Sequence, residues 1–388
     1  MHEQIERLQS TLSIDLSHIR TAAKTSLDSL EQARSIAKNY LTSQGVLQRG
    51  KKTDDLELGL VAFGSFARQE LSLGESDFDH AVVAYKAIER PEDIQHYRSA
   101  AIAIQKELQL GEHGQTRLFG GILSSADLIN RIGLEGDTNR SHTQRMLFLE
   151  ESLPIIDEVG HQVTVRAILR RYLVDYKNYE DNSPLQKRGV PRFLLNDVIR
   201  YWRTIAVDYQ AKRWDELLFS VTPDAGALVD IVPPKWGLRY IKLRSSRKLA
   251  FAGTIVSLLM PRILDVRVDE DFLSSQFSMP PLARLAQLVD VVNDDDLGTL
   301  ATIFVLADKF VAHFDDSNFR DATSKIEHPR LPCENEQFNL GRAETEQLEN
   351  ALETLFQSPR PLKSDAPALD GFQGKLSLYQ LVCRYMLF

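Results

Sequence analysis

Apolar residues recur every three or four positions through the first 43 residues of the chain, as in Ile5, Leu8 and Leu12. This spacing is typical of an amphipathic helix. We expect one long helix or two shorter ones in residues 2–43, followed by a polar linker over 44–55. The apolar stripe of these helices would be buried against the rest of the chain or against a second copy of it.

Between residues 56 and 127 the pattern changes to short apolar runs separated by polar and helical stretches. Residues 58–63 form a continuous apolar run that is typical of a buried strand. A helix is expected to begin at Pro91, because proline suits the first helical turn, and a further strand is expected over 115–123. Strands that alternate with helices in this order imply a small mixed sheet with helices on one face.

Helical periodicity dominates from residue 128 onward. Helices are expected over 145–153, 162–177, 192–214, 240–258, 297–314, 343–356 and 377–387, with a long loop over 315–342. The chain is therefore predicted to be α+β, with a small mixed β-sheet domain followed by a large α-helical domain. We expect an N-terminal helical segment (1–45), the sheet domain (46–150), the helical domain (151–315) and a C-terminal region of loop and helices (316–388).

The bulk composition narrows the class of protein. With 388 residues, of which 43% are hydrophobic and 26% charged, the chain resembles an ordinary soluble protein of several domains. The longest apolar stretch, 249–260, is too short to cross a bilayer, so we expect no membrane association and a cytoplasmic location. Two cysteines are too few for a disulfide framework. The net charge of -8 argues against non-specific binding to DNA.

Candidate chemistry gathers around the first strand. Gly64 and Ser65 follow it and are expected to turn the chain before a short helix over 66–71, and Asp77 and Asp79 come next. Residues two apart on a strand point to the same side, so the two carboxylates are expected to lie together. Their repulsion raises one pKa unless a cation lies between them, and Mg²⁺ prefers oxygen ligands shared with substrate phosphates. The turn offers N–H groups and a hydroxyl to such a phosphate.

The order of these residues resembles a known family. Gly-Ser-Phe-Ala-Arg-Gln-Glu at 64–70, followed by Ser-Asp-Phe-Asp at 76–79, resembles the nucleotidyltransferase superfamily, which has a polymerase-beta-like fold. Within it the chain is most similar to the bacterial branch of PII-protein uridylyltransferases and related nucleotidyltransferases. The similarity covers roughly residues 55–255.

The resemblance implies roles for particular side chains. Asp77 and Asp79 would be the catalytic metal ligands for two Mg²⁺ ions, or for Mn²⁺ in their place. The nucleotide would be bound by Gly64, Ser65, Arg68, Lys242 and Arg247.

Other interpretations of the same residues stay open. Arg68 could instead form an ion pair with a neighbouring acid such as Glu70. The basic residues of segment 239–248 could instead form a solvated helix face. A third carboxylate is usual on a neighbouring strand, but the expected strand over 115–123 contains none, and Glu112 and Asp127 only flank it.

These observations lead to one expected function and two alternatives. We expect a magnesium-dependent enzyme that transfers a nucleoside monophosphate from an NTP, such as ATP, to a protein or tRNA acceptor and releases pyrophosphate. The alternatives are a catalytically weak nucleotide-binding regulatory module and a synthase of nucleotide second messengers. Assembly into a homo-oligomer through the N-terminal helices is also expected.

Overall fold

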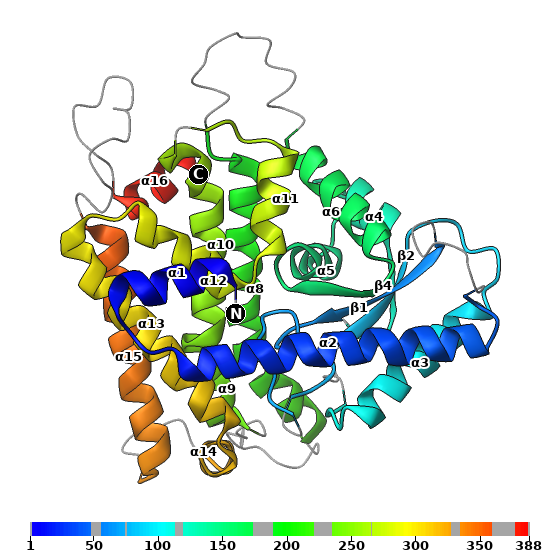
Figure 1. Cartoon of the computed structure of the whole chain (residues 1–388), viewed down its shortest axis with the longest axis horizontal. Coiled ribbons are helices and arrows are strands. Elements are labelled where there is room, and N and C mark those ends of the chain that lie inside the picture. The colour runs from blue at the N-terminus through cyan, green and yellow to red at the C-terminus, as the bar shows by residue number, and fades with distance from the viewer. Residues whose placement is uncertain are drawn as a thin grey trace.

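The computed structural model describes residues 2–47, 56–73, 76–112, 119–173, 189–220, 235–264, 266–326, 334–358 and 377–386, with only the backbone described over 210–220. Its helices are α1 (Glu3–Leu12), α2 (Ser17–Ser43), α3 (Asp93–Glu107), α4 (Ser125–Asn130), α5 (Asn139–Glu150), α6 (Glu158–Tyr172), α8 (Arg192–Ser220), α9 (Trp236–Arg244), α10 (Ser246–Ile263), α11 (Glu270–Ser278), α12 (Pro281–Ala286), α13 (Asp294–Asp315), α14 (Ser317–Ser324), α15 (Glu336–Gln357) and α16 (Leu378–Tyr385), with a 3₁₀ turn at Gln287–Asp290. A small sheet lies at one end of the molecule and the later helices form the other (Figure 1).

The sheet is mixed, as the sequence predicts. Its strands are β1 (Leu58–Phe63), β2 (His80–Ala84), β3 (Ile122–Ser124) and β4 (Ser152–Ile156), in the spatial order β3-β2-β1-β4. β1 pairs antiparallel with β2 and β4, whereas β2 and β3 are parallel. All six residues of β1 are buried, which explains why its sequence is apolar throughout rather than alternating.

Helices cover both faces of the sheet, so the expectation of helices on one face is wrong. Leu58, Leu60 and Ala62 of β1 pack with apolar side chains of α2 and α3. Val61 and Phe63 point to the opposite face, where the apolar side chains of α5 and α6 belong to the same core. Successive residues of a strand face opposite sides, and here the side chains on both sides are apolar.

The N-terminal helices connect the two ends of the molecule. Figure 1 shows α2 running from the helical end to the sheet end. Near its start, the Ile19 amide donates to Oδ1 of Asp308 in α13 (2.8 Å), and near its end Leu41 joins the core beneath the sheet. The apolar stripe is therefore buried within the chain, and an oligomer formed through these helices would have to use their exposed sides.

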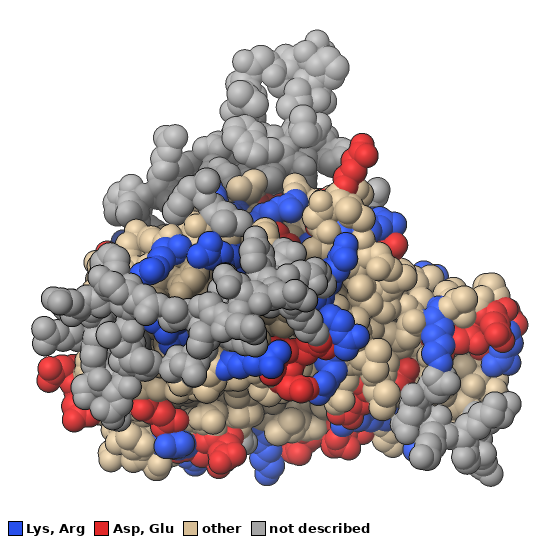
Figure 2. Space-filling view, turned by 90° about the horizontal axis from the view of Figure 1, so that it is seen from above, with Lys and Arg blue, Asp and Glu red and all other residues tan. Residues whose placement is uncertain are grey.

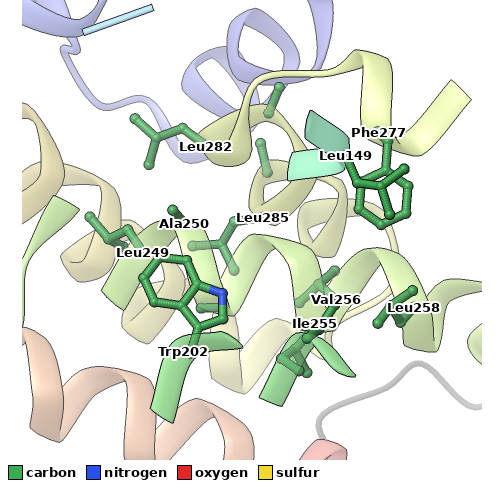
Figure 3. Close-up of a cluster of buried hydrophobic side chains, with 14 of the residues drawn as sticks. Leu149, Trp202, Leu249, Ala250, Ile255, Val256, Leu258, Phe277, Leu282 and Leu285 are labelled. Carbon is green, nitrogen blue, oxygen red and sulfur yellow. The ribbon is translucent and has the colours of Figure 1, made fainter. Parts of the chain in front are cut away.

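The helical end is built around α10. Figure 3 shows side chains from α10, α12, α8, α11 and α5 meeting in one cluster. Gly253 lies where α10 crosses α12: a Cβ at this position would overlap the carbonyl oxygen of Pro281 and lie 3.1 Å from its carbonyl carbon. The absence of a side chain at Gly253 allows the two helices to approach this closely.

Several element boundaries differ from those expected. Residues 64–69 form hydrogen-bonded turns rather than a short helix. β4 lies beyond residue 150, so the sheet continues into the segment assigned to the helical domain. The helix expected over 240–258 is broken at Ser245, and the loop expected over 315–342 contains α14 and the start of α15.

Some expectations fall on residues outside those described. They concern most of the linker over 44–55, the first part of the strand expected over 115–123, and residues 327–333 of the expected loop.

One helix, α13, is long and apolar enough to cross a membrane by length and composition alone, with a mean hydropathy of 1.4 over 18 residues. In this structure it packs against α2, α14 and α15. Its Asp308 carboxylate accepts a hydrogen bond from α2.

A pair of glycine substitutions tests the contact between α10 and α12. Gly253→Ala should destabilise the protein by about 1–3 kcal/mol, because the new methyl group meets backbone that cannot rotate away. Gly298→Ala in α13 is the matched control, because a Cβ added there would have no neighbouring atom within 4 Å; it should stabilise by about 0.5–1 kcal/mol through helix propensity. Urea unfolding of both variants measures the difference, and equal effects would contradict the close crossing.

Candidate functional site

The turn after β1 brings backbone against a carboxylate. Gly64 has φ +67°, in the left-handed region that glycine tolerates best. A Cβ at Gly64 would lie 3.0 Å from Oδ2 of Asp79. The Phe63 amide donates to the Asp79 carbonyl (2.8 Å), and the Arg68 amide donates to the Gly64 carbonyl (2.9 Å). The turn is therefore folded back on itself directly beside Asp79, with Ser65 half-buried in it.

The aspartate pair lies just before β2, in extended chain. Phe78 and His80 are buried and their rings stack 4.8 Å apart, whereas Asp77 is exposed and Asp79 half-buried. This alternation puts the two carboxylates on the side away from Phe78. The backbone of Asp77 forms an isolated β-bridge with that of Gly111. A Cβ added at Gly111 would lie 2.7 Å from Oδ1 of Asp77. Two glycines thus leave room for the two carboxylates.

The donor set suits Mg²⁺. The two carboxylates offer oxygen ligands, and an ion that completes its coordination with water and phosphate oxygens needs only one or two of them from the protein. Among the described residues, no group of three His, Cys, Asp or Glu side chains is placed to hold a metal ion. When bound, such an ion would neutralise phosphate charge and lower the pKa of an attacking hydroxyl.

Part of the segment that would carry a third carboxylate lies beside β2. The Gly120 amide donates to the His80 carbonyl (2.8 Å), so residues 119–121 lie next to the start of that strand. These residues are Phe, Gly and Gly, without a carboxylate. Asp127 follows the C-terminal end of β3 and forms an ion pair with Arg131 (2.8 Å). Because β3 runs parallel to β2, Asp127 lies at the opposite end of the strands from Asp77.

Arg68 is held by two carboxylates. Its Nε donates to Oε2 of Glu70 (2.9 Å), and one of its terminal nitrogens forms an ion pair with Glu151. The Arg68 side chain is 10% exposed and that of Glu151 is 1% exposed. These carboxylates keep the pKa of Arg68 well above its ordinary value although burial opposes this. The ion pair with Glu70 is therefore present, and a contact between Arg68 and phosphate stays a prediction.

Two further cations reach the same region from the helical end. The pKa of Lys242 is lowered to about 8, first by burial and then by the positive charges of Arg320, Arg68 and Arg247, while Asp77 opposes the shift. Lys242 therefore lies within the field of both Arg68 and Asp77. Its ammonium lies 5.3 Å from the ring centre of Phe314. Among the described residues, neither Lys242 nor Arg247 forms a salt bridge.

Arg244 and Lys248, from the same basic segment, behave differently. Arg244 Nε and Lys248 Nζ both contact Oε1 of Glu349 in α15, at 3.0 and 2.6 Å. The break at Ser245 ends α9 and starts α10, so the segment does not present one continuous helix face. The tertiary structure thus pairs Arg244 and Lys248 with one shared carboxylate, and it forms no such pair with Lys242 or Arg247 among the described residues.

The charges of Arg247 and Arg68 both act on one buried phenol, that of Tyr201. Burial raises the pKa of Tyr201, and Glu151 and Glu150 raise it further, whereas Arg247 and Arg68 lower it. Both arginines therefore lie close enough to one buried hydroxyl to affect its charge. We call the three cations that share this electrostatic field the basic cluster: Arg68, Lys242 and Arg247.

A surface hollow of about 400 Å³ lies elsewhere, between the start of α2 and the helices α13 and α15. Its walls include His18, Lys309 and His313, and none of the sequence-predicted site residues lines it.

The structure places some of the sequence-predicted residues in contact and relates others only through their charges. Gly64 contacts Asp79, and Arg68, Lys242 and Arg247 share one electrostatic environment with Asp77. The ion pair of Arg68 with Glu70 was one of the two interpretations left open by the sequence, whereas the supporting roles of Glu151 and Ser246 were not predicted. The Arg-x-Glu spacing was the available signal for Glu70, whereas Glu151 and Ser246 carry none, because their partners are 83 and 176 residues away.

Comparisons with known proteins do not extend this picture. No protein-family model matches the chain, and a search of curated proteins finds no match. The resemblance to nucleotidyltransferases therefore rests on the motif residues.

The low pKa of Lys242 predicts a stabilising substitution. The pKa of about 8 in the folded state lies below the ordinary 10.5, so between these values the unfolded chain binds more protons at this residue. A charged Lys242 therefore costs stability at pH 7, and the cost fades as the pH rises from 8 to 10.5. Lys242→Met should raise the free energy of unfolding by about 1–3 kcal/mol at pH 7 and by little at pH 10.5.

Lys248→Met is the matched control, because Lys248 belongs to the same segment but pairs with Glu349. It should lose about 0–1 kcal/mol at pH 7. Denaturant titrations at both pH values measure the two effects, and a destabilised Lys242→Met at pH 7 would show that its charge is compensated in the fold.

Proposed function

We propose that this protein is a magnesium-dependent nucleotidyltransferase that transfers a nucleoside monophosphate from an NTP to an acceptor and releases pyrophosphate. One observation carries the proposal. An acidic pair lies beside a glycine turn at the sheet end, and the charge of Asp77 acts on Lys242 of the helical end together with the charges of Arg68 and Arg247. Opposite charges are arranged in this way where a divalent ion and a polyphosphate bind together.

The residues have separate tasks in the proposed reaction. Asp77 and Asp79 bind the metal side of the substrate, with Mn²⁺ as an alternative to Mg²⁺. The Gly64–Ser65 turn lies against the phosphates, since the absence of a side chain at Gly64 lets a ligand approach the backbone. Arg68, Lys242 and Arg247 neutralise phosphate charge, and pre-positioned cations of this kind contribute most to phosphoryl transfer.

The acceptor in this proposal is a protein or an RNA. The face shown in Figure 2 carries Lys and Arg side chains among Asp and Glu side chains, and the chain has a net charge of -8. Sequence-independent binding to nucleic acids depends on neutralising many phosphates. These charges favour a protein acceptor, or an RNA that is recognised locally.

A second candidate is a nucleotide-binding module with little turnover. It is favoured by the lack of a third metal-ligating side chain beside the pair among the described residues. Such a module would bind an NTP through the same residues without releasing pyrophosphate.

Labelled NTPs test the proposal. Each of the four NTPs, labelled on the α-phosphate, is incubated with Mg²⁺, the protein, and a cell extract that supplies protein and RNA acceptors. Asp77→Asn and Asp79→Asn should each lower label transfer by about 100-fold or more, because metal coordination contributes several kcal/mol and each tenfold in rate is 1.36 kcal/mol.

Asp127→Asn is the control. Asp127 is an exposed carboxylate that pairs with Arg131, beside the sheet but at the opposite end of its strands from Asp77, so its substitution should leave transfer unchanged. NTP binding without transfer by the unsubstituted protein would support the nucleotide-binding module. A labelled oligonucleotide formed without any acceptor would indicate a second-messenger synthase. If the unsubstituted protein neither binds any NTP nor transfers label from it, the proposal is refuted.

A further inference from the structure

Glu70 joins the two ends of the molecule at the proposed site. Its Oε2 accepts a hydrogen bond from Nε of Arg68 (2.9 Å) and another from the hydroxyl of Ser246 (2.8 Å). Arg68 belongs to the turn after β1, and Ser246 is the first residue of α10. A single carboxylate oxygen therefore fixes the turn against the helix that carries Arg247.

The position of Glu70 suits this task. α10 begins without a side-chain cap at Ser245, and a carboxylate near the start of a helix is stabilised by the unpaired N–H groups there. The Glu70 side chain is 14% exposed, so solvent competes little for its hydrogen bonds. Glu151 binds Arg68 from the other side, which leaves the guanidinium little freedom to turn.

We propose that Glu70 is a positioning residue that keeps Arg68 and Arg247 directed at the same triphosphate. This inference rests on the proposed function, because it takes the basic cluster as the site that binds the phosphates of an NTP. In this arrangement Glu70 does not touch the substrate. It lowers the cost of ordering two long cationic side chains when the anion binds.

The negative charge of Glu70 allows a positioning role to be distinguished from a purely electrostatic effect on anion binding. A carboxylate beside an anion site repels the anion, so its removal should strengthen anion binding if charge alone matters. A positioning role predicts the opposite direction. Gln keeps an oxygen that can accept both hydrogen bonds, whereas Leu has none, and the two substitutions remove the same charge.

Calorimetric titration with inorganic tripolyphosphate compares the full-length protein with its Glu70→Gln and Glu70→Leu variants. Glu70→Leu should weaken binding by about tenfold and Glu70→Gln by about threefold or less, since Leu removes two hydrogen bonds and each contributes about threefold to holding the cations in place. Equal or tighter binding by Glu70→Leu would overturn the proposal.

Two further variants make the outcome independent of folding defects. Ser246→Ala removes one of the two hydrogen bonds and changes no charge, so it should weaken tripolyphosphate binding by about threefold. Glu349→Gln is the matched control, because Glu349 holds Arg244 and Lys248 of the same segment but lies outside the basic cluster; it should leave the affinity unchanged.

The two proposals fail in different ways. If the unsubstituted protein binds neither tripolyphosphate nor any NTP, the proposed function fails and the role of Glu70 with it. If the unsubstituted protein binds tripolyphosphate and the Glu70→Leu variant binds it equally well or more tightly, only the positioning role fails.

Discussion

The arrangement of the site depends on the Arg68 guanidinium and the two carboxylates that hold it. Arg68 leaves the turn after β1, Glu70 ties it to the first residue of α10, and Glu151 ties it to the end of α5. Removing one partner of a buried ion pair leaves an uncompensated charge, which is costly. The clamp therefore holds the sheet and the later helices in one relative position, which brings Asp77 and Lys242 into the same field.

Charge compensation separates residues that support the fold from residues available to a ligand. Arg244 and Lys248 share the carboxylate of Glu349, and Arg68 pairs with the carboxylates of Glu70 and Glu151. Lys242 is different, since burial and neighbouring cations lower its pKa. An arrangement that costs stability in the free protein, and that an anion would relieve, is typical of a binding site.

Much of the fold and part of the site follow from local sequence. The apolar run at 58–63 and the helical periodicity of α2 each predict the element that forms. The direction of the Asp77 and Asp79 side chains also follows from the sequence. The Phe78 side chain between them is apolar and favours burial, so its two neighbours point to the opposite side. The sequence did not reveal β4, since a short strand between two helices lacks a periodic signal. The continuous apolar run at 58–63 is itself typical of a strand covered on both faces, and the expectation of helices on one face did not use this signal.

The sequence by itself determined which residue types could carry the chemistry: a glycine turn, an acidic pair and a basic segment. Only the tertiary structure decided which members of the basic segment form ion pairs, because the distant Glu349 binds Arg244 and Lys248 but not Lys242 or Arg247. The same holds for the support of Arg68, whose partner Glu151 is 83 residues distant. Local sequence sets backbone preference and side-chain alternation, whereas the pairing of charges depends on which elements pack together.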